Sequence, residues 1–232
     1  MERSRRTWLA VALGAGASSA LASAQATRPK GAAEHPIGDE GVGPGEDLMR
    51  EHGVLNRILL VYDEGVRRIR AGIPPPTEEL RAGASLIKKF LEDYHERLEE
   101  EHLFPLFERA GKLTDLVSVL RAQHLAGRRL TASILAPPSP GAAKGAAELA
   151  DRLSQFVRMY RPHEAREDTV LFPAFRELVT RQEYERLGDE FEGREDKVLG
   201  PRGFERVVEE VASIEKALGI HDLASFTPAT AK

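Results

Sequence analysis

The sequence predicts an all-α protein, an antiparallel up-down-up-down four-helix bundle with additional C-terminal helices. Three observations support this fold class. Aromatic residues make up only 6% of the 232 residues, Ala and Leu are abundant, and the β-branched residues that favour strands do not dominate. From residue 46 onward, apolar residues recur at helical spacing. Segments rich in Pro and Gly divide this pattern into long stretches, and long helices joined by short loops typically pack as an antiparallel bundle.

The first 26 residues have the pattern of an export signal. Arg3, Arg5 and Arg6 precede an apolar run over residues 8–17, and Ala-x-Ala patterns follow at residues 22–26. The apolar run is too short to remain in a bilayer as a membrane span. We therefore predict a signal peptide at residues 1–26, with a disordered or cytosolic arm as the alternative.

The basic N-terminal region of this segment also resembles a known export signal. Residues 4–9 read Ser-Arg-Arg-Thr-Trp-Leu, which is similar to the twin-arginine signal of bacteria. That route exports folded proteins, often after a cofactor has been loaded. We therefore expect a periplasmic protein that has no membrane anchor after signal cleavage.

The boundaries of the next predicted elements are marked by Pro and Gly residues. Residues 27–45 lack periodicity and are predicted as a linker or extended arm. A helix over 46–71 ends before three consecutive prolines, and a second helix over 77–110 is predicted to have Thr77 as its cap and Gly111 as its end. These two helices form the first predicted hairpin.

The second half of the chain predicts another hairpin and a helical extension. Helices are expected over 112–135 and 144–179, separated by a loop at 137–141. A capping box at residues 180–183 predicts a new helix, and a last amphipathic helix covers 204–218. We assign residues 46–187 to the bundle and residues 188–232 to a C-terminal helical extension packed on it.

Residues 95–108 and 163–176 repeat one another. Seven of the fourteen positions are identical, and each segment contains His-x-x-x-Glu followed by Leu-Phe-Pro. Each repeat lies on the second helix of a predicted hairpin, and the first helix of each hairpin carries a further histidine, His52 or His124. The two halves of the bundle therefore offer the same set of side chains to a shared interior.

The spacing within the repeat indicates metal chemistry. Residues four apart on a helix share a face, so each repeat presents an imidazole and a carboxylate to one point. Four histidines and two carboxylates in a dry interior are costly without a cation. Imidazole and carboxylate suit iron, manganese or zinc, and two carboxylates can bridge two ions about 3.5–4 Å apart. The chain has no cysteine, so a metal site must be built from these residue types alone.

Three further residues are weaker candidates for metal ligands or for outer contacts. His102 lies on the same face as His95, but its counterpart in the repeat is Val170. Asp168 adjoins a predicted ligand but is rotated about 100° from it, and Tyr160 lies one turn before the second repeat. A single His, Glu or Tyr in a helix is more often a surface or packing residue, so these three carry less weight than the repeated pattern.

Over residues 45–187 these motifs resemble the haemerythrin-like, HHE cation-binding family. The resemblance is strongest at residues 51–52, 95–105, 123–124 and 160–173. In that family a four-helix bundle holds a non-haem di-iron centre with bridging carboxylates. The resemblance implies two iron ions, Fe2+ or Fe3+, with a bridging oxo or hydroxo group and no haem. The ligands that it implies are His52, His95, Glu99, His124, His163 and Glu167.

The chain departs from the oxygen-carrying members of the family at Arg128, where those proteins place another histidine. With one histidine fewer, one iron is expected to keep an open or water-filled position that admits O2, peroxide or NO.

Three functions remain open. The first is an exported protein that binds O2 or a related ligand for storage, scavenging or sensing. The second is a di-iron oxidase, a peroxidase-like enzyme or an NO-detoxifying enzyme, and the third is an iron or zinc carrier. The lack of a recognisable substrate pocket favours the first, and the net charge of −4 gives no basic surface for nucleic acid.

Overall fold

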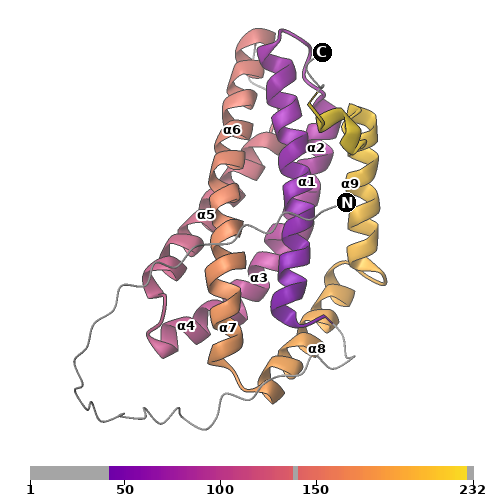
Figure 1. Cartoon of the computed structure of the whole chain (residues 1–232). Helices are drawn as coiled ribbons and strands as arrows, with labels where there is room; N and C mark the ends of the chain where they lie inside the picture. Colours follow the sequence, from indigo (N-terminus) through magenta and orange to yellow (C-terminus); the bar gives the residue numbers. More distant parts are fainter. Residues whose placement is uncertain (1–41, 138–140, 229–232) are drawn as a thin grey trace, which may run out of the picture. The chain divides into compact units, whose positions relative to one another are not determined.

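A computed structural model describes residues 42–137 and 141–228, and every regular element in these residues is helical (Figure 1). Within these residues the segments join into six continuous helices, because three π-helical segments link five of the nine α-helical pieces. The predicted signal peptide and the linker up to residue 41 lie outside the described residues. The elements are α1 (Pro44–Arg70), α2 (Thr77–Leu86), η1 (Ile87–His95), α3 (Glu96–Leu98), η2 (Glu99–Leu103), α4 (Phe104–Ala110), α5 (Thr114–Leu135), α6 (Ala142–Arg166), η3 (Glu167–Leu171), α7 (Phe172–Leu178), α8 (Arg181–Val198), α9 (Gly203–Leu218) and the short 3-10 turn η4 (Leu223–Phe226).

The long helix predicted over 77–110 is continuous from α2 to α4, but its predicted cap is wrong. Pro76 occupies the cap position, and Thr77 is already the first helical residue. The Thr77 hydroxyl instead donates a hydrogen bond to the Pro75 carbonyl at 3.3 Å. Gly111 ends the helix in the left-handed conformation with a φ of 62°, as the sequence predicts.

Two other helix starts show how the sequence sets the boundaries. Helix α5 begins at Thr114 rather than at the predicted residue 112, because Leu113 also takes a positive φ, of 51°. At the start of α8, the Thr180 hydroxyl accepts a hydrogen bond from the Glu183 backbone N–H at 3.2 Å. This contact confirms the predicted N-cap of that helix.

The long helices enclose a single apolar core. Helix α1 packs along α6, α5 packs along α6, and α2 contacts both α1 and α5. Helix α9 packs against α1 and α2, on the outside of this group. None of the described helices combines the length and the apolar character that a membrane-spanning helix requires. The largest fully buried aromatic side chains in the core are Tyr62, Tyr94, Tyr160, Phe90, Phe104, Phe107, Phe156, Phe172, Phe175 and Phe191.

Two of the π-helical turns occupy equivalent places in the sequence repeat. The turn η2 begins at Glu99 and η3 begins at Glu167, and each is followed directly by Phe-Pro. In each turn the N–H of the Phe bonds the carbonyl of the Glu five residues earlier. The following proline has no N–H to donate, and its ring crowds the carbonyl four residues earlier, so a wider turn is favoured. The repeated Leu-Phe-Pro therefore sets the local backbone at both glutamates.

Candidate metal centre

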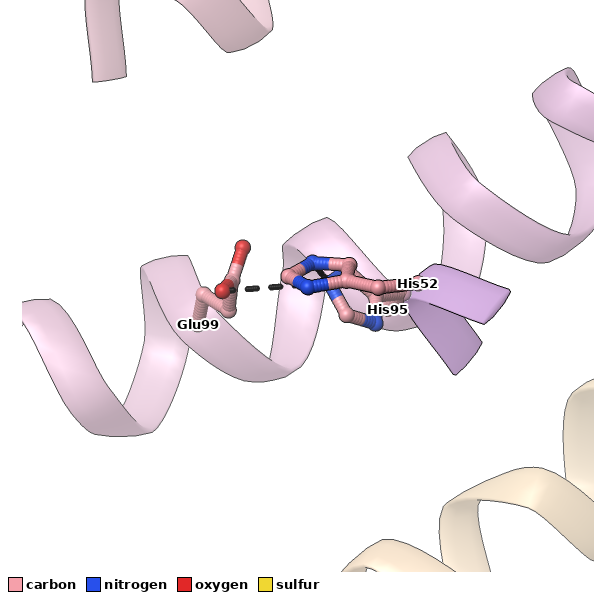
Figure 2. A group of neighbouring side chains, drawn as sticks. All are labelled: His52, His95 and Glu99. Carbon is pink, nitrogen blue, oxygen red and sulfur yellow. Dashed lines mark hydrogen bonds and ion pairs between the residues drawn. The ribbon is translucent and has the colours of Figure 1, made fainter. Parts of the chain in front are cut away.

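Three side chains from the first half of the chain converge on one point. His52 comes from α1, His95 from the end of η1 and Glu99 from the start of η2 (Figure 2). Their candidate ligand atoms all lie within 4.8 Å of one another, and the three residues are at most 2% exposed. The Nε2 atoms of the two imidazoles are 3.1 Å apart. Such close, buried nitrogen and oxygen atoms form a group that could hold a cation.

The second half of the chain repeats this arrangement. His124 from α5, His163 from α6 and Glu167 from η3 also bring candidate ligand atoms within 4.8 Å of one another. These residues are between 0% and 3% exposed. The structure thus brings together all six residues that the sequence motifs predict as ligands, in two groups of three.

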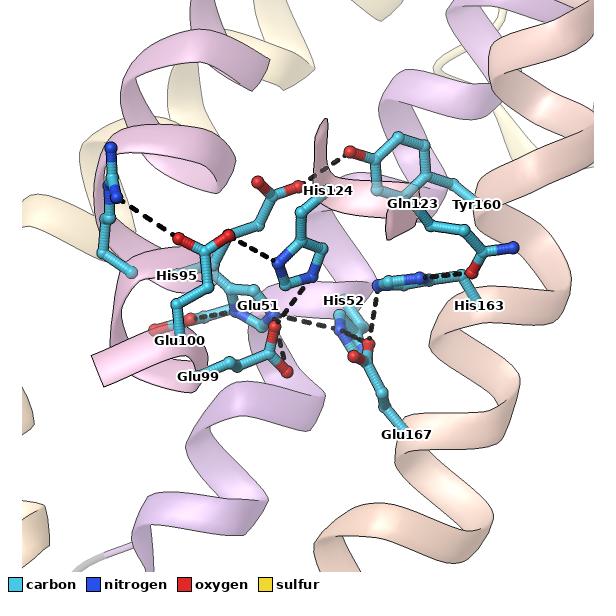
Figure 3. A network of polar contacts seen from close by, with 12 residues as sticks. Glu51, His52, His95, Glu99, Glu100, Gln123, His124, Tyr160, His163 and Glu167 are labelled. Carbon is cyan, nitrogen blue, oxygen red and sulfur yellow. Dashed lines mark hydrogen bonds and ion pairs between the residues drawn. The ribbon is translucent and has the colours of Figure 1, made fainter. Parts of the chain in front are cut away.

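Each carboxylate contacts a histidine of both groups (Figure 3). Glu99 has one oxygen 3.8 Å from His95 Nε2 and the other 3.3 Å from His124 Nε2. A single oxygen of Glu167 lies 3.1 Å from one imidazole and 3.4 Å from another, the Nε2 atoms of His163 and His52. The two carboxylates therefore stand between the two groups of histidines.

The outward nitrogen of each imidazole is held by an oxygen. His95 Nδ1 lies 2.6 Å from Glu51 and His52 Nδ1 lies 2.7 Å from Asp168. A ring that donates through Nδ1–H to these acceptors turns the lone pair of Nε2 towards the centre. The hydrogen bonds therefore select the tautomer that can ligate a metal.

The histidines of the second group are held in the same way. His124 Nδ1 lies 3.0 Å from Glu100, and His163 Nδ1 lies 2.9 Å from the side-chain oxygen of Gln123. Three of the four imidazoles thus bond a carboxylate, and one bonds an amide. This is the main chemical difference between two otherwise similar halves.

The ligand atoms at the centre are better suited to binding a cation than to hydrogen bonding with one another. Both oxygens of Glu99, both oxygens of Glu167 and Nε2 of His124 are buried and make no hydrogen bond among the described residues. Buried carboxylates without hydrogen bonds are costly, and a cation removes that cost. Imidazole nitrogen with carboxylate oxygen is a donor set that suits iron.

Comparison with known proteins identifies the family. The Hemerythrin HHE cation binding domain matches residues 44–175, more than half of the chain. The chain belongs to this haemerythrin family. It is 50% identical over 186 residues to an uncharacterized protein of Mycobacterium tuberculosis strain H37Rv, and an uncharacterized protein of Mycobacterium bovis matches equally well. Each match covers 79% of this chain and 73% of the relative. No solved structure matches the chain.

Within this haemerythrin domain, neighbouring carboxylates raise the pKa of two imidazoles despite their burial. Burial alone lowers the pKa of His52, but the hydrogen bond to Asp168 and the charge of Glu167 raise it to about 9. Burial also opposes protonation of His124, but the charge of Glu96, the hydrogen bond to Glu100 and the nearby carboxylate of Glu99 raise its pKa to about 10. These two side chains hold protons at neutral pH when no cation competes.

The other two imidazoles have lowered pKa values. Burial is the main cause and brings the pKa of His95 to about 4. For His163, burial and the positive charge of His124 lower the pKa to about 3. These rings are neutral at physiological pH and are ready to ligate a metal.

The weaker candidates take three different places around the haemerythrin site. Asp168 is the outer hydrogen-bond partner of His52. The Tyr160 hydroxyl donates to Glu96 at 2.7 Å, and the Tyr160 ring meets His163 edge-on. Asp168 and Tyr160 therefore support ligand side chains from outside.

His102 belongs to neither group of three. Its Nε2 lies 3.8 Å from Glu190, and its ring packs beside Phe191 on α8. A histidine seven residues after His95 was expected on the same face, but the intervening π-helical turn changes the number of residues per turn. Its contacts join the second long helix to the C-terminal extension.

Sequence reasoning did not assign several residues that complete the site. Arg128 lies 2.9 Å from Glu96 and 2.8 Å from Glu100, and it neutralises this pair of carboxylates. The repeat carried a usable signal for the outer partners, because each flanks a ligand at a matching position. Glu51 and Gln123 precede the single histidines, and Glu100 and Asp168 follow the ligand glutamates.

Proposed function

We propose that this haemerythrin-family protein binds two iron ions, one at each group of three side chains. The observation that carries the proposal is the position of Glu99 and Glu167, because each buried carboxylate contacts a histidine of both groups. A carboxylate in this place can share its oxygens between two neighbouring ions. The bridging oxo or hydroxo group implied by the family resemblance remains a prediction.

The protein supplies orientation and a dry environment for such a pair of ions. Bound iron provides one-electron redox chemistry and a site for O2, peroxide or NO. The chain holds each imidazole by its Nδ1 contact and covers the site with aromatic rings. Phe104 stacks on His124 at 5.4 Å, and Phe172 stacks on His52 at 5.5 Å between ring centroids. These rings exclude water, which strengthens the electrostatic interactions inside the site.

A small-ligand position is supported by the contacts of Arg128. Oxygen-carrying members of the family place an additional histidine at this point of the sequence. Here the guanidinium is engaged by Glu96 and Glu100 instead of contributing a ligand atom. With six protein ligands for two ions, a coordination position is left for O2, peroxide or NO. We therefore infer reversible binding of such a ligand, for storage, scavenging or sensing.

A di-iron enzyme is the second candidate, and the Tyr160–Glu96 pair favours it. The Tyr160 hydroxyl bonds a carboxylate that is 1% exposed, and its ring touches a predicted ligand, His163. A buried phenol with a proton acceptor beside a redox centre suits oxidase, peroxidase-like or NO-detoxifying chemistry. A metal carrier is less well supported, because the six predicted ligands are at most 3% exposed and rapid transfer of an ion needs access.

Oxygenation of the reduced, iron-loaded protein separates these functions. Binding predicts a visible charge-transfer band that appears with O2 and disappears when O2 is removed. Irreversible oxidation with turnover of added peroxide would indicate the enzyme instead. If no spectral change occurs and the iron passes readily to a chelator, the protein is a carrier and the gas-binding proposal is wrong.

We also propose the up-down-up-down bundle topology and export to the periplasm. Membership of the haemerythrin family and the packing of α1 on α6 and α5 on α6 support the topology. The Arg5-Arg6 pair and the apolar run that follows it support export by the twin-arginine route. Replacing both arginines by lysine should abolish export of the protein. Unchanged export of the double variant would contradict this route.

A further inference from the structure

Helix α5 presents an apolar stripe to solvent. Val119 and Leu125 are 53% and 56% exposed, and the exposed Ala122 lies between them at a spacing of three residues. Positions three or four apart on a helix form one continuous face. The neighbouring helix α6 exposes charged side chains such as Arg158 and Arg161 instead. An exposed apolar face on one helix indicates a contact surface.

A charge of opposite sign stands at each end of this face. Asp115 and Arg129 are both exposed, and neither has an ion-pair partner in the part of the chain that the structure describes. The positions recur at intervals of three and four residues over two heptads, which is the pattern of a helix that pairs with another helix. We call this set the α5 stripe, and its members are Asp115, Ser118, Val119, Ala122, Leu125, Ala126 and Arg129.

The α5 stripe is complementary to itself when it is reversed. Each member lies as far before Ala122 as its complement lies after it. An antiparallel copy centred on Ala122 therefore sets Asp115 against the partner's Arg129 and Val119 against the partner's Leu125. The small Ala122 meets its own copy at the two-fold axis and allows close approach. A parallel copy would instead set like charges side by side, which is unfavourable.

We propose that two copies of this chain associate through antiparallel pairing of their α5 stripes. Such a contact is isologous and closes as a two-fold dimer, so it does not propagate into fibres. The contact of α9 with α1 and α2 places that helix on other elements than α5. Seven residues on each side is a small patch compared with the roughly 20–30 residues of a standard interface. The dimer is therefore expected to be weak and to depend on protein concentration.

Cysteine cross-linking tests the geometry directly, because the natural chain contains no cysteine. Ala122→Cys places two thiols at the two-fold axis and should form disulfide-linked dimers under mild oxidation. Asp115→Cys alone should not cross-link, because its two copies lie about 21 Å apart along the paired helices. A mixture of Asp115→Cys and Arg129→Cys should cross-link. Ile73→Cys, which is exposed but lies outside the stripe, is the control.

Sedimentation of the full chain tests the energetics. The unaltered protein should shift from monomer to dimer as its concentration rises, and Leu125→Glu should weaken dimerisation by about tenfold or more because it buries an unpaired charge. Ile73→Glu should have no effect. Asp115→Arg or Arg129→Asp alone should weaken the dimer, and the double variant should restore it because the charges again complement each other.

Three results would overturn the proposal. The first is a protein that stays monomeric at all accessible concentrations, and the second is a dimer that Leu125→Glu does not weaken. The third is efficient self-cross-linking of Asp115→Cys, which would indicate parallel pairing. Helical content and bound metal are measured for each variant, because an unfolded variant would not report on association. None of the altered residues belongs to the metal site, so both should remain unchanged.

Discussion

At the scale of single residues, each imidazole of the site is fixed from both ends. Its Nε2 points to the centre and its Nδ1 contacts an oxygen between 2.6 and 3.0 Å away. The inner six residues could be predicted from spacing, because His-x-x-x-Glu places both side chains on one helix face. Of the outer partners only Asp168 was a candidate from the sequence, because all four of these contacts reach across to another helix. Glu100, for example, follows a ligand on one helix and bonds His124 on the next.

The contact between Glu51 and His95 gives a test at this scale. Glu51→Gln replaces a carboxylate acceptor by an amide and makes the His95 ring a weaker ligand. We expect metal affinity to fall by about 10–100-fold while the number of sites stays the same. Titration with Zn2+ as a redox-inert probe measures both quantities. Glu101→Gln, an exposed position whose side chain pairs with Arg194, is the matched control and should bind metal normally.

The raised pKa values of His52 and His124 predict a pH dependence of metal binding. With pKa values of about 9 and about 10, both rings are protonated at neutral pH and must lose their protons to ligate a metal. Affinity should therefore rise with pH, by about two log units per pH unit below pH 9. Calorimetry in buffers of different ionisation enthalpy counts the released protons. Binding without proton release at pH 7 would contradict this account.

At the scale of elements, Pro and Gly predicted the helix ends closely, although the predicted cap Thr77 was wrong and α5 begins at Thr114 rather than at residue 112. The internal geometry of the helices did not follow from the sequence. The sequence predicted one long helix over 77–110, and the structure adds two π-helical segments to it. A period of 3.6 residues remains visible in the hydrophobic pattern even where the hydrogen bonds shift by one residue. Leu-Phe-Pro after each ligand glutamate was the available signal, because a proline inside a helix disturbs the preceding turn.

Helices α5 and α6 approach closely at Gly127. A Cβ atom added there would overlap the hydroxyl of Tyr160 and lie 2.8 Å from the Tyr160 Cζ. Gly127→Ala should therefore destabilise the protein by about 1–3 kcal/mol, because the buried ring must move. Denaturant unfolding measures the change. Gly193→Ala on α8, where an added Cβ would meet no atom within 4 Å beyond its own helix backbone and chain neighbours, should instead stabilise by about 0.4–1 kcal/mol. Similar effects at both positions would refute the close approach.

At the scale of the whole molecule, an ion pair fastens the C-terminal helix to the bundle. Arg57 on α1 makes two hydrogen bonds with Glu215 on α9, at 2.6 and 2.9 Å. Burial acts to raise the pKa of Glu215, but the hydrogen bonds from Arg57 and His221 outweigh it and lower the pKa. The lowered pKa means that the pair stabilises the fold above the ordinary Glu pKa of 4.5 and loses this effect as the pH falls further.

Removal of the arginine tests this attachment. Arg57→Ala leaves a mostly buried carboxylate without its main partner, so the free energy of unfolding near pH 7 should fall by about 1–3 kcal/mol. The difference from the unaltered protein should shrink as the pH drops below 4.5. Arg186→Ala, which loses an exposed pair with Glu190, should have a smaller effect. Equal losses for the two variants would show that the Arg57 pair has no special role.

We propose that one chain holds two iron ions between its two similar halves. The most direct test is the iron content of the purified, iron-loaded protein, measured per chain by elemental analysis together with its His163→Ala variant. We expect two irons per chain in the unaltered protein and a sharp loss of iron in the variant. A protein that contains one zinc and no iron, or a variant that retains all of its iron, would contradict it.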